Sequence, residues 1–345
     1  MCVDLAKVFA LIFMVAVHTM MYGGSKFDET LSLLVGWVFG GPLSAPVFMV
    51  CMGIGVTYSR HNDAASLFRR GWKLLLVSYL FNAIRALCYP LMAWGTGDGT
   101  YLSQFVHLLF FVDILQFAGV AFILLALLRK LNASVGVVIA VGLVLSAVGS
   151  FVHDMSTGII PVDILLSLIA GVPTEPVFSA FPLLNWFIFV ALGLGIGKLM
   201  RCCNDLDRVF AWITPVSAVI FIGLTAWMLP NHYGLYEGTE TAYYYMNILE
   251  ALTVGMSAAL LSLGVGHFIG KLVKGKTAEL VQRTSSDLNK IYLVHWVILM
   301  WVVDCLLCRI LDFEFSSVEQ LLIAFVVLIV SAWIARRKPI SNIKL

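Results

Sequence analysis

Residues 4–22 read DLAKVFALIFMVAVHTMMY, an apolar run in which no charged residue stands between Lys7 and His18. A helix needs about 20 mostly apolar residues to cross the hydrocarbon core of a bilayer. Runs of this kind recur at 31–59, 71–94, 104–128, 134–152, 179–199, 209–229, 243–270, 287–310 and 317–335. We therefore predict an all-α bundle of ten transmembrane helices, built by residues 1–345 as a single domain.

The composition excludes a soluble globular protein. Hydrophobic residues make up 61% of the 345 residues and charged residues only 12%. Soluble domains carry roughly a quarter charged residues. So few charged residues could not cover a surface in water. We therefore expect the lipid bilayer to surround the protein, and we expect no nucleic-acid partner.

Two apolar runs depart from the simple pattern. The run 31–59 is too long for one straight span, and we expect it to break or kink at Gly40, Gly41, Pro42 and Pro46. The short apolar piece 159–172 is better suited to an interfacial or re-entrant segment than to a span.

The positions of Lys and Arg predict the orientation in the membrane. Basic residues accumulate in cytoplasmic loops. All but three of the 22 fall at the N-terminus, in the C-terminal tail or in alternate connections, the exceptions being Lys26, Arg85 and Arg309. This pattern fits ten spans with both termini in the cytoplasm, as expected for a protein of a bacterial cytoplasmic membrane.

Ionisable and amide side chains inside the spans indicate a polar cavity. Such residues are costly in a membrane helix and usually mark a site or a polar pathway. In the first helix His18 lies on the same face as Asp4 and Lys7, by helical spacing. Other helices contribute the expected cavity residues Asn82, Arg85, Asn185 and His295.

His18 is the candidate catalytic residue. Imidazole can accept a proton from an attacking hydroxyl or amine near neutral pH, and Asp113 or Glu250 could orient it. Alternatively, His18 only joins two helices by a hydrogen bond. Arg85 could equally neutralise one of the two carboxylates.

A basic cluster, Arg69, Arg70 and Lys73, lies at the start of the third apolar run, where the predicted topology puts the cytoplasmic end of the helix. It could bind lipid headgroups and fix the orientation, or it could hold the phosphates of a ligand that enters from the cytoplasm. No spacing of cysteine and histidine residues matches a zinc site, so no metal is expected.

Six segments resemble, in order, motifs of the integral-membrane acyltransferase clan, which includes the type-three acyltransferases and the heparan-α-glucosaminide N-acetyltransferase-like proteins. The first is Asp4 and Lys7 followed by an apolar run that ends in His18. The others are APVFMVCMG at 45–53, FRRG at 68–71, DILQFAG at 113–119, FPLLNW at 181–186 with later glycines, and IYLVH at 291–295.

This resemblance implies transfer of an acyl group, usually acetyl from acetyl-CoA on the cytoplasmic side, to a hydroxyl or amine outside, often on a sugar. The resemblance implies that His18 acts as general base on the acceptor, or alternatively that it forms a transient acyl-histidine. Arg69, Arg70 and Lys73 would then hold the CoA phosphates. A homo-oligomer is left open.

Two other functions fit the same polar residues. A transporter could carry a polar solute or a lipid-linked sugar through the cavity, and broken helices such as 31–59 would suit it. A non-catalytic membrane partner would use its polar residues only to join helices. Substrate-dependent release of CoA distinguishes an acyltransferase from both.

Overall fold

The protein is described here by a computed structural model that covers residues 1–23, 34–152, 155–171, 177–231 and 247–337. These residues form two compact units. Unit one comprises 1–47, 84–102 and 258–345, and unit two comprises 48–83 and 103–257. Within the described ranges, all regular structure is helical apart from one isolated bridge between Val112 and Ser179.

The described part of the chain contains nine helical segments that are long and apolar enough to cross a membrane. This confirms the predicted polytopic all-α fold, and the orientation of the termini stays a prediction. The segments are Cys2–Tyr22, Leu34–Tyr58, Ala64–Thr96, Val135–Val152, Leu183–Cys202, Leu206–Trp227, Ala251–Leu272, Leu288–Ile310 and Ser317–Ala335.

The expected span 104–128 is interrupted. Helix α6 (Thr100–Phe110) ends before the interruption, and a new helix, α7 (Ile114–Lys130), starts after Asp113. Asp113 is the N-cap of α7: its Oδ1 accepts from the Ile114 N–H at 2.7 Å, while Gln116 accepts from the Asp113 N–H at 3.2 Å. The 17 residues of α7 lie at the lower limit of length for a membrane span.

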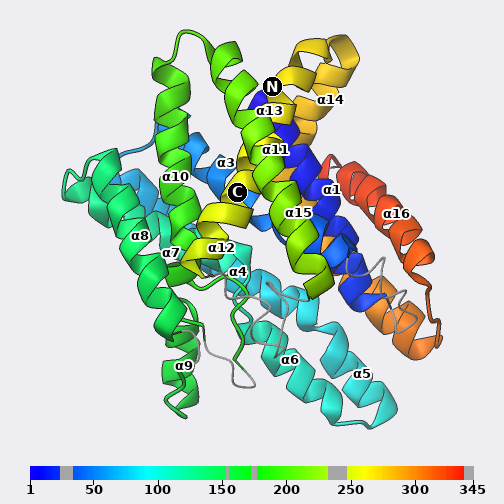
Figure 1. Ribbon diagram of the computed structural model, residues 1–345. Coiled ribbons are helices and arrows are strands. Elements are labelled where there is room, and N and C mark those ends of the chain that lie inside the picture. Colours follow the sequence, from blue (N-terminus) through cyan, green and yellow to red (C-terminus); the bar gives the residue numbers. More distant parts are fainter. Residues whose placement is uncertain (24–33, 153–154, 172–176, 232–246, 338–345) are drawn as a thin grey trace. The chain divides into compact units, whose positions relative to one another are not determined.

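Unit one is organised around α1 (Cys2–Tyr22). This helix packs along α16 (Ser317–Ala335) and also contacts α15 (Leu288–Ile298) and the π-helix η4 (Leu299–Ile310) that continues α15 (Figure 1). The same unit holds the π-helix η1 (Leu34–Gly40), α5 (Cys88–Thr96) and α14 (Gly275–Ser286).

The predicted break in run 31–59 is confirmed. The chain leaves η1 at Gly40, turns, and resumes as α3 (Ala45–Tyr58), so that Pro46 stands in the first turn, where its missing N–H costs nothing. Gly40 also permits a close approach to α1, since a Cβ there would lie 2.5 Å from the Val17 side chain.

Unit two pairs helices closely through small residues. α8 (Val135–Val152) lies beside α10 (Leu183–Cys202) (Figure 1). α10 also approaches the part of α3 in this unit, where a Cβ on Gly193 would lie 2.3 Å from the Val50 carbonyl oxygen. The unit includes most of α4 (Ala64–Ala86), as well as α11 (Leu206–Asn231), α12 (Ile248–Glu250) and η3 (Ala251–Gly255), and α13 (Met256–Leu272) starts in it.

The short segment at 159–172 contains α9 (Ile160–Ser167), whose eight residues are too few to cross a bilayer. Asp163 anchors it by accepting hydrogen bonds from the Thr157 N–H at 2.8 Å and from the Ser156 hydroxyl at 2.8 Å. These bonds, the one from the Thr157 N–H above all, lower the pKa of Asp163. The expectation that this piece is not a span is confirmed.

Candidate functional site

The structure joins two of the predicted site residues directly. His18 Nδ1 lies 3.0 Å from His295 Nε2, although 277 positions separate the two residues in the sequence. The imidazole rings are almost parallel, at 8°. His295 is fully buried, whereas His18 keeps part of its surface accessible. Of the two rings, His18 is therefore the one that has surface outside the packed interior.

The hydrogen-bond pattern assigns the protons of this pair. His295 Nδ1 lies 3.3 Å from the Ile291 carbonyl oxygen, which can only accept, so Nδ1 carries a proton. In a neutral His295, Nε2 is then an acceptor and must receive its hydrogen bond from His18 Nδ1. His18 Nε2 is consequently left with a lone pair, which is the form that a general base requires.

Trp296 packs against His18 and was not among the residues singled out from the sequence. Its ring centroid lies 4.2 Å from that of His18 and 5.6 Å from that of Tyr22, which contacts it edge-on. The buried indole N–H makes no hydrogen bond within the described part of the chain. A buried donor without an acceptor is costly, so this group is available for an oxygen of a bound ligand.

Arg85 adds a positive charge to the same region of unit one. It is fully buried in α4, and its guanidinium carbon lies 4.9 Å from the centroid of the Trp296 ring. A cation over an indole face is stabilised by the electrons of the ring. Arg85 is thus held beside the ring that packs on His18.

The two carboxylates that were expected to orient His18, Asp113 and Glu250, belong to unit two, and their contact with His18 stays a prediction. Asp113 lies in unit two, where it caps α7. Glu250 is the last residue of α12, and its side chain lies outside the described residues. Within unit one, the ring nitrogen of His18 that the structure shows paired is Nδ1, and its partner is His295.

Asn82 and Asn185, expected to line the cavity, are both buried in unit two. Asn82 Nδ2 donates to the carbonyl oxygens of Leu109 and Phe111, at 3.2 and 2.8 Å, and so satisfies the end of α6. Asn185 lies where α10 meets α8, because a Cβ on Gly149 would come within 2.7 Å of its Oδ1. A contact of either residue with substrate stays a prediction.

The basic cluster Arg69, Arg70 and Lys73 lies on α4 in unit two, with all three side chains exposed. Arg70 places its guanidinium carbon 4.4 Å from the centroid of the Phe122 ring. Arg69 Nε donates to the Ala65 carbonyl oxygen at 3.4 Å. All three charged groups of the cluster therefore lie at the surface of unit two.

No three His, Cys, Asp or Glu side chains lie close enough to hold a metal ion among the residues that the structure describes. All seven cysteines are free thiols.

Comparison with known proteins gives one match. A family model described as an acyltransferase domain matches residues 2–337, nearly the whole chain. No curated protein and no solved structure matches the chain.

Proposed function

The chain belongs to the acyltransferase family of integral-membrane acyltransferases, and from this premise we propose that it transfers an acyl group, acetyl in the first instance, from cytoplasmic acyl-CoA to an extracytoplasmic acceptor. The acceptor supplies a hydroxyl or an amine of a carbohydrate. The observation that carries the proposal is the His18–His295 pair, which leaves the Nε2 lone pair of His18 available.

In the proposed reaction, His18 Nε2 takes the proton of the acceptor O–H or N–H as that atom attacks the thioester carbonyl. The new C–O or C–N bond forms and the C–S bond breaks. The departing CoA thiolate takes the proton back from His18, which restores the neutral pair. His295 holds His18 in the required tautomer throughout, the role that a carboxylate plays in hydrolytic triads.

Oxygen charge that develops on the attacked carbonyl needs hydrogen-bond donors. The Trp296 indole N–H, whose ring packs on His18, and the Arg85 guanidinium, which lies over that ring, are donor groups in this part of unit one. Donors fixed in a buried site before the reaction starts are the most effective at stabilising such charge. We propose that these two residues donate hydrogen bonds to the carbonyl oxygen of the acyl group.

We assign the CoA phosphates to Arg69, Arg70 and Lys73, whose exposed charged groups suit phosphate oxygens. This assignment does not depend on the histidine pair, so the two halves of the proposal can be tested separately.

The test is binding and slow hydrolysis of acetyl-CoA by the purified protein in detergent, with release of free CoA as the readout. His18→Ala should reduce CoA release by about 10²–10⁴-fold while leaving acetyl-CoA binding nearly intact. Arg70→Ala should weaken the binding. His267→Ala and Arg208→Ala, which remove the same side-chain types elsewhere, serve as matched controls.

Wild-type release of CoA by His18→Ala would remove this histidine from the chemistry. If the well-folded wild type bound neither acetyl-CoA nor longer acyl-CoAs, acyl transfer would be wrong, and transport of a polar solute would become the better explanation.

A further inference from the structure

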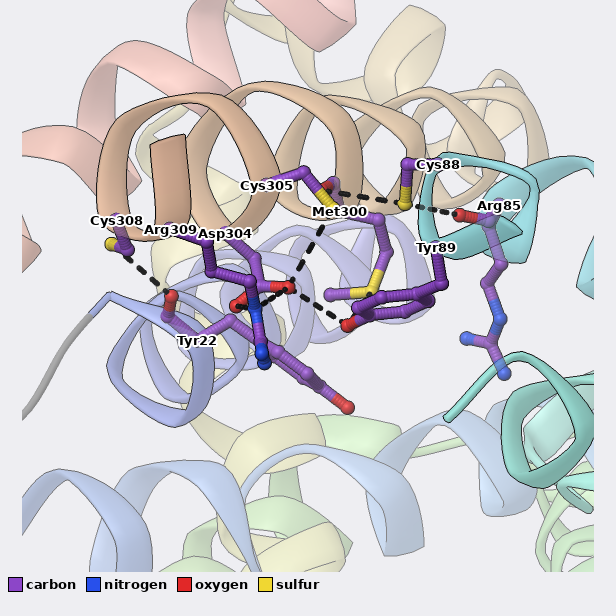
Figure 2. Close-up of polar contacts among 9 residues, drawn as sticks. All are labelled: Tyr22, Arg85, Cys88, Tyr89, Met300, Asp304, Cys305, Cys308 and Arg309. Carbon is purple, nitrogen blue, oxygen red and sulfur yellow. Dashed lines mark hydrogen bonds and ion pairs between the residues drawn. The ribbon is translucent and has the colours of Figure 1, made fainter. Parts of the chain in front are cut away.

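A second polar cluster of unit one, beyond the histidine pair, is centred on Asp304 in η4. This carboxylate is 5% exposed. The Tyr89 hydroxyl donates to Oδ2 at 2.8 Å, and Arg309 Nε lies 3.0 Å from both carboxylate oxygens (Figure 2). The Cys305 thiol adds a weak contact to Oδ2 at 3.9 Å. Asp304 is therefore engaged by protein donors and has little capacity left for a ligand.

Arg309, in contrast, uses only one of its three nitrogens. Its two terminal amino groups, Nη1 and Nη2, make no hydrogen bond to any residue that the structure describes. The guanidinium carbon lies 5.5 Å from the Tyr89 ring centroid and 5.7 Å from that of Tyr101. Two bonds to Asp304 and two aromatic rings thus hold a fork of donors in place, and 31% of the side chain is exposed.

The Asp304–Arg309 contact depends on the π-helical turn. Residues five apart in an α-helix point about 140° away from each other, given 3.6 residues per turn. In a π-helix, which closes with i→i+5 hydrogen bonds, they lie side by side. Such turns are rare and occur frequently at functional sites, so the geometry of η4 is a separate indication that this cluster has a role.

The cluster is linked to the histidine pair within unit one. Tyr22 stands one turn after His18 on α1, about 6 Å along the axis, and contacts Trp296. Its carbonyl oxygen lies 3.8 Å from the thiol of Cys308, the neighbour of Arg309 (Figure 2). Tyr22 therefore contacts both Trp296, which packs on His18, and Cys308, which precedes Arg309, so that the two clusters share a neighbour.

We propose that Arg309, held by Asp304, Tyr89 and Tyr101, forms an anion-binding subsite for the acceptor, and that the acceptor carries a carboxylate or phosphate group. The planar Nη1–Nη2 edge matches two oxygens of either group. This inference rests on the proposed acyl transfer and specifies its acceptor class. Asp304 is a positioning residue, since its own oxygens are already engaged.

The direct test is affinity measured by calorimetry on the full chain in uncharged detergent. The probes are methyl α-D-glucuronide and glucose 6-phosphate, each compared with the neutral methyl α-D-glucoside. The wild type should bind at least one anionic probe tenfold or more tightly than the glucoside. Arg309→Gln should abolish that preference, because a neutral amide lacks both the charge and the fork.

Two further variants separate binding from structure. Arg309→Lys keeps a positive charge beside Asp304 but loses the fork, so it should keep the melting temperature and lose most of the preference. Arg283→Gln removes an exposed, ion-paired arginine elsewhere in unit one and should change neither quantity. A preference that survives in both Arg309 variants would overturn the subsite, as would equal wild-type affinity for all three sugars.

The outcomes distinguish this inference from the proposed reaction. If the wild type releases CoA from acetyl-CoA but shows no preference for an anion, the subsite is wrong and acyl transfer stands. If an Arg309-dependent preference appears in a protein that neither binds nor hydrolyses acyl-CoA, the subsite stands and acyl transfer is wrong. Binding of phosphatidylglycerol alone, with neither sugar anion bound, would overturn the acceptor subsite in favour of a lipid contact.

Discussion

The His18–His295 pair and the Asp304–Arg309 pair are both polar contacts inside apolar segments of unit one. They differ in what remains for a ligand: the first leaves a hydrogen-bond acceptor, and the second leaves hydrogen-bond donors. The two imidazoles use a donor and an acceptor between them, and the lone pair of His18 Nε2 remains. The ion pair uses up the acceptor oxygens and leaves the terminal N–H groups of Arg309. One pair can take a proton, while the other can hold an anion.

The difference shows that burial alone does not assign a role to a polar residue in a membrane helix. Both pairs could be described simply as contacts that join helices. The protein partners that each residue already has determine which atoms can meet a ligand. Substitutions that change one partner at a time can therefore separate the chemical role from the structural one.

The largest effect is expected from His295→Phe, which keeps an aromatic ring but removes the acceptor for His18 Nδ1–H. The kcat for CoA release should fall by about 10²–10³-fold with little change in KM, because His18 loses its fixed tautomer. His295→Gln, whose side-chain oxygen can accept the same proton, should restore part of the rate. Steady-state kinetics of both variants would show this, and wild-type kcat in His295→Phe would contradict the assigned pairing.

A smaller effect, on stability, is expected from Asp304→Ala. Removal of one partner of a buried ion pair leaves the other charge uncompensated, at a cost of about 3–5 kcal/mol when both are fully buried. Because Arg309 is partly exposed, water offsets some of this cost, and we expect about 2 kcal/mol of destabilisation.

Thermal unfolding in detergent measures that loss, with Asp304→Asn as the matched variant that still accepts from Tyr89. In the double variant with Arg309→Gln, the loss should be smaller than the sum of the single losses. Additive losses would mean that the two residues do not stabilise each other.

The smallest effect is expected from Tyr89→Phe, which removes one hydroxyl but keeps the ring against the Arg309 guanidinium. The free energy of unfolding should fall by about 1 kcal/mol, the net value of one hydrogen bond. The preference for an anionic sugar should fall much less than in Arg309→Gln. A larger loss of preference in Tyr89→Phe would place the hydroxyl, rather than the arginine, at the ligand.

The interrupted span at 104–128 shows a signal that was present in the sequence and was not used. Asp113 and Gln116 precede an apolar run with the spacing of a capping box, a pattern that marks the start of a helix. Applied in this way, it predicts that α7 begins at Ile114, as observed. The same pattern explains why Asp113 serves the backbone of its own helix.

The sequence by itself determined the features that depend on local properties of the chain. Apolar runs of sufficient length predicted the membrane helices, glycine and proline predicted the break after Gly40, and helical spacing placed His18 on a polar face. Each of these follows from interactions between residues a few positions apart. The family resemblance, which the match over residues 2–337 confirms, also depended only on the order of short motifs.

Only the tertiary structure decided which polar residues meet. The contact of His18 with His295 joins α1 to α15, and no periodicity within either helix specifies the partner. Asp304 and Arg309 lie close in sequence, yet an α-helical reading separates them, and the π-helical turn is what brings them together. In both cases the physical reason is the same: a hydrogen bond depends on atomic positions that neighbouring helices and backbone geometry set, and the one-dimensional pattern does not contain them.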